Sequence, residues 1–269
     1  MKDSLKFRGE VIARNKATGE ILFEQHNCIV EGGRIMTLAK AFNMNNAQLN
    51  KLAKPIEDGG NAELSEWFEN CTGDSGDYSI MKFKAGFDRS FEESSTAEVS
   101  FNTQLSVNTQ ATDLNSNTVY IGDIDFFTKE DAAYTEKDDI PKIYYEDDTG
   151  ESSYTWDDGD ANSMQPLLNK AGAFDTIFIR YKLMMKMPRQ NASAGDPAYI
   201  VDDPEDTSSQ GWRNPDLTVP YVTINELGLF MSSEDEVDDG EWLMFSLLKF
   251  PPITLQAEME VEFEYRIYG

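Results

Sequence analysis

The sequence predicts a mostly β protein: an antiparallel β-sandwich or barrel with one short amphipathic helix and long acidic loop insertions. Three observations support this fold class. Residues 253–268 alternate apolar and polar side chains without a slip, residues 4–30 have the pattern of a β-hairpin, and five more strand-like segments lie between them. Alternation with a period of two is typical of strands that bury one face. We expect a single β domain over residues 1–269.

The first element is a predicted hairpin, because two strand-like segments flank the turn-forming residues 15–20. The polar face of its first strand carries Lys6, Arg8 and Arg14, whereas the polar face of 253–268 carries four glutamates. Opposite charges across a ladder stabilise it by roughly 0.2–1 kcal/mol per pair. We therefore expect the N- and C-terminal strands to lie in one sheet. The alternative is that each polar face simply meets water.

A short amphipathic helix is expected over residues 34–42, where apolar residues recur at helical spacing. Two glycines at 32–33 indicate the break that ends the preceding strand. We expect the apolar side of this helix to pack on the sheet. The residues on that side are Ile35, Leu38, Ala39 and Phe42.

The remaining expected strands follow the same rules of apolar enrichment and alternation. They are 78–86, 119–127, 175–187, 221–230, 242–250 and 253–268. Pro251 and Pro252 are expected to kink the chain into the last of them.

Two insertions, 123–160 and 189–220, are expected to run over the outside of the fold. The first contains 14 acidic residues and three lysines, a net charge of −11. It is also aromatic, through Tyr144, Tyr145, Tyr154 and Trp156.

The net charge of −26, from 23 basic and 49 acidic residues, disfavours a nucleic-acid partner because a phosphate backbone would be repelled. No segment has the run of apolar residues that crosses a bilayer, so we expect no membrane insertion. The chain has two cysteines, Cys28 and Cys71, and no signal-like apolar run near Met1. Synthesis in the cytoplasm with reduced thiols is the resulting expectation.

Catalysis by a histidine dyad or triad is disfavoured, because His26 is the only histidine and lies in a predicted strand. Phosphate-binding, dinucleotide-binding and zinc motifs are absent from the sequence. The segment 158–162 has the oxygen spacing that begins a calcium loop, but Ser163 and Asn169 replace the required glycine and glutamate. A solvated acidic turn explains it better. We expect no enzyme activity and no catalytic, cofactor or metal site.

The order of segments resembles a family of tailed-bacteriophage virion structural proteins. The similarity begins with the hairpin at 9–20 and continues with the sequence His-Asn-Cys-Ile-Val-Glu-Gly-Gly-Arg at 26–34, which leads into a helix and then a strand at 80–86. It resumes with Ile-Asn-Glu-Leu-Gly-Leu-Phe at 224–230, and with Leu-Leu-Lys-Phe-Pro-Pro-Ile at 247–253 before the alternating last strand. Both ends and the middle strand are covered, but the acidic insertions are not.

The resemblance implies a β-rich component of the phage tail, neck or baseplate. Such a protein is present in several copies around an axis, as a homo-oligomer or ring, and contacts other virion proteins. If the resemblance holds, the insertions 123–160 and 189–220 are the candidates for contacts with neighbouring subunits. The competing class is a carbohydrate-binding or adhesive module that recognises a host-surface glycan. Its sugar-stacking residues would come from Tyr154, Trp156, Trp212 and Trp242. A third class, an acidic glycan hydrolase, would use a pair of the many carboxylates.

Overall fold

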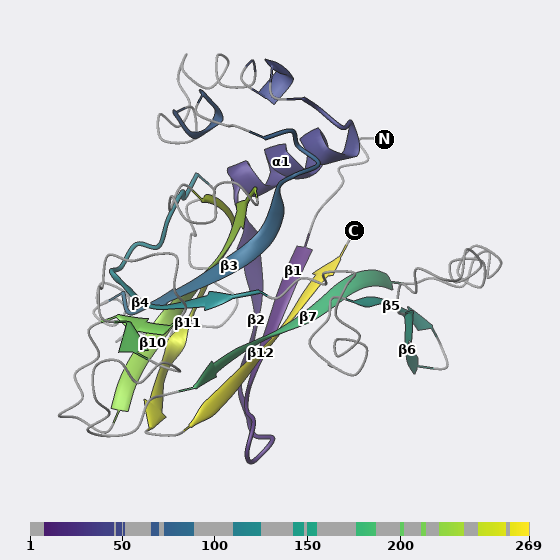
Figure 1. Cartoon of the computed structure of the whole chain (residues 1–269). Helices are drawn as coiled ribbons and strands as arrows, with labels where there is room; N and C mark the ends of the chain where they lie inside the picture. The colour runs from purple at the N-terminus through teal and green to yellow at the C-terminus, as the bar shows by residue number, and fades with distance from the viewer. Residues whose placement is uncertain are drawn as a thin grey trace. The chain divides into compact units, whose positions relative to one another are not determined.

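The structure is a computed structural model, shown in Figure 1, and it confirms the predicted fold class: the chain is mostly antiparallel β. The residues that it describes are 8–45, 47–49, 51, 66–69, 73–88, 110–124, 142–147, 150–154, 176–186, 200–201, 211–213, 221–233, 242–256 and 259–268.

Within these residues, twelve strands and one longer helix make up the fold. In chain order they are β1 (Arg8–Asn15), β2 (Ile21–Ile29), α1 (Glu31–Ala41), β3 (Ser79–Gly86), β4 (Thr118–Asp123), β5 (Lys142–Asp147), β6 (Gly150–Tyr154), β7 (Thr176–Lys186), β8 (Ile200–Val201), β9 (Gly211–Arg213), β10 (Tyr221–Ser232), β11 (Leu243–Gln256) and β12 (Glu260–Tyr268).

The chain divides into two compact units. Unit 1 consists of residues 1–26, 125–184 and 261–269, and unit 2 consists of residues 27–124 and 185–260. Strand β2 contributes to both, because its residues up to His26 belong to unit 1 and its remainder to unit 2.

In unit 1 the strands follow the order β6-β5-β7-β12-β1-β2. The N-terminal strand β1 pairs antiparallel with the C-terminal strand β12, from Arg8 opposite Tyr268 to Asn15 opposite Val261. This pairing buries a set of apolar side chains, and the rings of Phe23 and Phe263 lie 6.2 Å apart. The buried apolar residues of β1 and β12 are Val11, Ile12, Ala13, Val261, Phe263 and Tyr265.

Charged side chains cross the same ladder. The Nη1 atom of Arg14 lies 3.0 Å from Oε2 of Glu264, and Nη2 of Arg266 lies 2.7 Å from the other oxygen of that carboxylate. Arg14 stands opposite Glu262 in the register, so its partner Glu264 is the diagonal neighbour. Because Glu264 is buried, two guanidinium groups compensate a charge that burial alone would disfavour.

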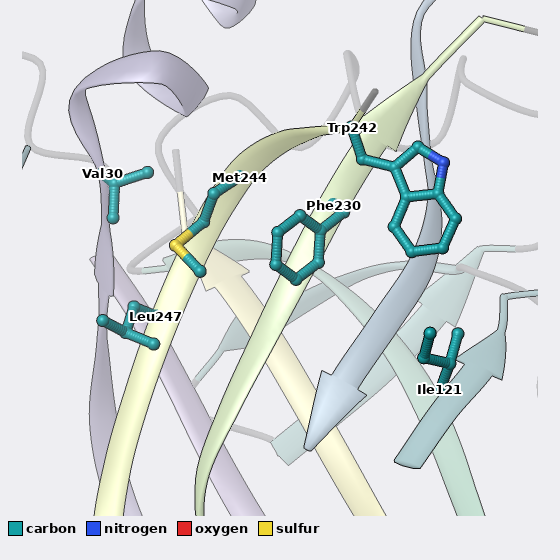
Figure 2. Close-up of a cluster of buried hydrophobic side chains, with 6 residues drawn as sticks. All are labelled: Val30, Ile121, Phe230, Trp242, Met244 and Leu247. Atoms are coloured by element: carbon teal, nitrogen blue, oxygen red, sulfur yellow. The ribbon is translucent and has the colours of Figure 1, made fainter. Parts of the chain in front are cut away.

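In unit 2 the order is β2-β11-β10-β3-β4-β9-β8, with the long antiparallel pair β10 and β11 at its centre. Over residues 224–232 and 243–248 both faces of this pair are buried, since consecutive residues of each strand are shielded from solvent. Figure 2 shows the cluster on one face, where Phe230 lies between Met244 and Trp242. The whole cluster consists of Val30, Ile121, Phe230, Trp242, Met244 and Leu247.

The opposite face of β3 and β4 carries an aromatic row. The rings of Phe83 and Tyr120 lie 5.7 Å apart, and those of Tyr120 and Trp212 lie 4.9 Å apart in an edge-on arrangement. Phe83 packs where Gly122 lacks a side chain, since a Cβ atom on that glycine would overlap the ring. This row fixes β9 beside β4.

The prediction of one strand over residues 253–268 is wrong. Strand β11 continues through Pro251 and Pro252 to Gln256 and pairs with β10, whereas β12 begins at Glu260 and pairs with β1. The amide N–H of Met259 donates to the carbonyl oxygen of Gln256 over 2.9 Å, as in a turn. The kink expected at the prolines is instead a bulge.

At this bulge the β10–β11 register jumps. Ile224 faces Ile253 and Glu226 faces Lys249, so Asn225 alone stands opposite residues 250–252. Prolines lack the N–H that a regular ladder requires, and a bulge is where a strand can hold them.

The predicted packing face of the helix is correct for Ala39, which is buried, but wrong for Leu38 and Phe42. Helix α1 begins at Glu31, includes the two glycines, and buries Gly32, Gly33, Met36 and Ala39. Leu38 and Phe42, expected inside, are exposed. The glycines belong to the packing face because α1 approaches β11 closely: a Cβ atom on Gly33 would collide with the carbonyl oxygen of Phe245.

Both predicted insertions contain strands. The range 123–160 contains β5 and β6, which pair antiparallel with each other, and β5 also pairs antiparallel with β7, which lies outside the range. The range 189–220 contains β8 and β9, which pair parallel. Apart from Asp123 and Ile124, at the end of β4, the other residues of these ranges, the calcium-like segment 158–162 among them, lie outside the described residues.

Candidate functional site

A segment of residues 110–117, which we call the strap, lies against the face of β3 and β10. Its Leu114 packs against the cluster of Figure 2. The carboxylate of Glu226 on β10 accepts hydrogen bonds from the backbone N–H groups of Asn115 (3.0 Å) and Ser116 (3.1 Å), and from the Ser116 hydroxyl (2.8 Å). Glu226 has no solvent exposure, so its charge is held by the strap.

Gly86 makes room for this arrangement. It stands directly opposite Glu226 in the β3–β10 ladder, and a Cβ atom there would overlap the hydroxyl of Ser116. The same atom would lie 3.1 Å from Leu114 and 3.0 Å from the carbonyl oxygen of Asn117. The strap backbone therefore fits only over a position without a side chain.

Lys249 and Asn225 connect Glu226 to the segment at Asp88. Lys249 on β11 places Nζ 2.9 Å from Asp88 and 3.7 Å from Glu226. Asn225 binds the backbone of Asp88 twice, accepting from its N–H at 2.7 Å and donating to its carbonyl at 2.9 Å. We call Asp88, Asn225, Glu226 and Lys249 the buried polar cluster.

Lys84 on β3 reaches Asp113 in the middle of the strap. Nζ of Lys84 lies 2.9 Å and 3.1 Å from the two carboxylate oxygens of Asp113. The same ammonium lies 4.5 Å from the ring centre of Phe230 and 5.4 Å from that of Trp242. These are cation–π distances, so Lys84 joins the strap to the aromatic cluster.

The buried polar cluster has a structural role. A pair of carboxylates is also what a glycoside hydrolase site needs, and there the two acids flank a space for the sugar. In this protein the Glu226 oxygens already bind strap donors, and Asp88 binds Lys249. The acids thus serve to fasten the strap and the segment at Asp88 to the β10–β11 pair.

Two of the four residues proposed for sugar stacking are inside the protein. Trp212 is fully buried beside Tyr120, and Trp242 is buried against Phe230. Neither ring is placed to stack on a soluble glycan. A platform would have to use Tyr154 and Trp156, whose side chains lie outside the described residues.

His26 is exposed on β2. Among the described residues, no group of three or more histidine, cysteine, aspartate or glutamate side chains has an arrangement that could hold a metal ion. In the same part of the chain, no helix combines the length and apolar character needed to span a membrane.

The C-terminal end of α1 is fixed by a Schellman motif. The N–H of Asn43 donates to the carbonyl of Lys40, the N–H of Met44 donates to that of Ala39, and Asn43 has the left-handed φ of 48°. Residues 75–78 hold this end from outside. The Ser75 hydroxyl donates to the carbonyl oxygen of Ala39, and the N–H of Ser75 donates to that of Met44. The Lys40 ammonium donates to the carbonyl oxygens of Gly76 and Tyr78.

Apolar side chains point into water from this rigid end. Leu38 is 51% exposed and Phe42 is 79% exposed. Arg34, one turn before Leu38, is exposed as well. Residues spaced by four share one side of a helix, so these three form one surface, which we call the α1 patch. The sequence pattern missed it because it counted both apolar side chains as core.

Two titratable groups lie near the ends of α1. Burial raises the pKa of the Cys28 thiol above its usual 9.0, and the charge of Arg34 partly opposes this effect. Burial lowers the pKa of Lys40, and the charge of Asp77 partly opposes that shift. The Lys40 ammonium therefore exchanges part of its hydration for the carbonyl groups of residues 76 and 78.

Comparison of the chain with protein-family models, curated proteins and solved structures gives no match.

Proposed function

We propose that the protein is a structural component of a tailed-phage virion, part of the tail, neck or baseplate, that acts through contacts between subunits. One observation supports this function most. Three of the segments that carry the resemblance, 27–34, 224–230 and 247–253, form one packed framework in unit 2 although the first is far from the other two in the sequence.

The contacts within this framework are structural. Val30 donates its N–H to the carbonyl of Phe245, and the glycines at the start of α1 pack on β11. Glu226, from the second segment, holds the strap. Residues whose pattern suggested the family thus position elements of the fold, which suits a protein whose role is to be assembled rather than to catalyse.

The experiment is quantitative mass spectrometry of tailed particles purified from the source of this sequence. The chain should be present in several copies per particle, at a fixed ratio to the other structural proteins. Its absence from well-purified particles contradicts the proposal.

A variant experiment tests the role of the first insertion. A chain that lacks residues 145–165 loses the end of β5 and all of β6, so a second variant should lack only 155–165 and keep both strands. Both are expected to remain soluble and to be excluded from particles. The matched control, with Glu20 and Glu24 of the exposed hairpin changed to Gln, should be incorporated normally.

A further inference from the structure

The α1 patch lies in a basic segment of an acidic chain. Residues 32–56 contain four basic residues and no acidic one, a charge of +4, which leaves −30 for the rest of the chain. The basic residues are Arg34, Lys40, Lys51 and Lys54. Arg34 and Lys51 are both exposed. Lys40 binds the carbonyls of Gly76 and Tyr78, so the exposed positive charges of this segment among the described residues are Arg34 and Lys51.

The backbone that carries the apolar side chains of the α1 patch is fixed by hydrogen bonds. Those of the Schellman motif hold the backbone on both sides of Phe42, and residues 75–78 brace the same turn. An exposed aromatic side chain on a fixed backbone loses little backbone freedom on binding and buries a large area. Such residues are the usual anchors of protein interfaces.

We propose that the α1 patch is a docking surface for a second copy of this chain. The inference deepens the proposed function and rests on it for its place in a particle. Leu38 and Phe42 supply apolar anchors, and Arg34 beside them attracts carboxylates. A copy of this chain offers 49 acidic residues, all of them outside residues 32–56. Charge complementarity therefore favours a contact between the α1 patch of one copy and an acidic surface of the other copy, outside that copy's α1 patch.

This choice of surfaces restricts the symmetry of the assembly. Two α1 patches facing each other directly would bring like charges together. A contact made once per pair of copies, from the α1 patch of one to an acidic surface of the next, is heterologous and gives closed rings or open filaments. The same contact made twice, in both directions, would instead close a twofold dimer. We propose the heterologous form, because it accords with the ring expected of the proposed function.

Sedimentation velocity of the purified full-length chain tests the docking surface. Wild-type protein should associate below about 1 mM, the range of weak specific complexes. Phe42→Ser and Leu38→Ser should each weaken association by about tenfold or more, and Arg34→Glu should weaken it as well. Tyr221→Ser is the matched control, because Tyr221 is half exposed in the same unit. It should associate like wild type, and all variants should keep the wild-type melting temperature.

A mixing experiment tests the heterologous geometry. Phe42→Ser protein keeps its acidic surface, so it should bind the α1 patch of wild-type protein and shorten the assemblies as its fraction rises. A wild-type chain that stays monomeric, variants that associate normally, or Phe42→Ser protein that does not enter mixed assemblies would each overturn the inference. A monomeric chain that is nevertheless found in particles overturns this inference alone, whereas an associating chain absent from particles overturns only the proposed function.

Discussion

Gly33 and Phe245 are in such close contact that no side chain fits between them. The α-carbon of Gly33 faces the carbonyl oxygen of Phe245, the same oxygen that accepts the N–H of Val30. Phe245 is the extra residue of a bulge, since Leu229 faces Ser246 and Phe230 faces Met244. The bulge turns this carbonyl toward the start of α1 and thereby ties the helix to β11.

Gly33→Ala should consequently destabilise the protein by about 1–3 kcal/mol, because overpacking against a backbone atom cannot be relieved by a side-chain rotation. Urea denaturation measures the effect. Gly76→Ala is the matched control: a Cβ atom there lies 3.6 Å from the nearest side-chain atom, Oδ1 of Asn43. Equal stability of Gly33→Ala and wild type would contradict the close approach.

Glu226→Gln should cost about 1.5–3 kcal/mol, the usual value of hydrogen bonds to a charged group. The amide loses the charge that Lys249 and the strap donors bind, and its NH₂ group faces N–H donors of the strap. Denaturation in urea again provides the measurement.

Asp113→Asn, which removes the strap's contact with Lys84, is the control. Its carboxylate is 55% exposed, so the loss should stay below about 1 kcal/mol. A larger effect at Asp113 than at Glu226 would contradict the assignment of Glu226 as the main strap contact.

Cys28 should react slowly with thiol reagents at pH 8–9, because burial raises its pKa above 9.0. The rate of alkylation against pH, measured on the Cys71→Ser background, should have its midpoint above 9.0. Arg34→Ala should raise this midpoint further, since the guanidinium favours the thiolate, and Arg34→Lys should retain it. A midpoint at or below 9.0 in the wild-type protein would count against this environment.

Tyr265 should make the protein sensitive to alkali. Its phenol is fully buried, and burial raises its pKa well above the usual 10.0. The folded state keeps the proton that the unfolded state releases, so this stabilising contribution is complete below pH 10 and declines as the pH rises further.

The decline should be about 1.4 kcal/mol per pH unit above about pH 10, relative to Tyr265→Phe. Stability measured by urea denaturation between pH 8 and 11 separates the two proteins. Tyr221→Phe, at a half-exposed position, should follow the wild-type curve. Parallel curves for wild type and Tyr265→Phe would contradict the prediction.

The strands could be predicted from the sequence because alternation survives in most of them, and β3, β4, β7 and β10 lie within a few residues of their expected bounds. The turn between β11 and β12 could not. Leu255 and Val261 are both buried and are an even number of residues apart, so the alternation passes through the turn unchanged. Only pairing with different partners, β10 and β1, separates the two strands.

The candidate site was harder to predict for a related reason. By hydrophobicity alone, Leu38 and Phe42 are expected in the core and a glycine is not expected to mark a packing face. The side of α1 that packs is nevertheless the side with Gly32 and Gly33. The strap and the buried polar cluster depend on contacts between residues more than 100 positions apart, such as Ser116 with Glu226. No local pattern marks them.

The two prolines of β11 lie where this strand has extra residues. Between Lys249 and Ile253 the chain takes four steps while β10 takes two, and Ile253 still faces Ile224. The bulge at Phe245 absorbs one extra residue in the same pair of strands. Deleting one proline would leave a bulge of that kind, and deleting both would leave a regular ladder. Leu255 should stay buried in either case, so this position should tolerate changes in length that a regular strand does not.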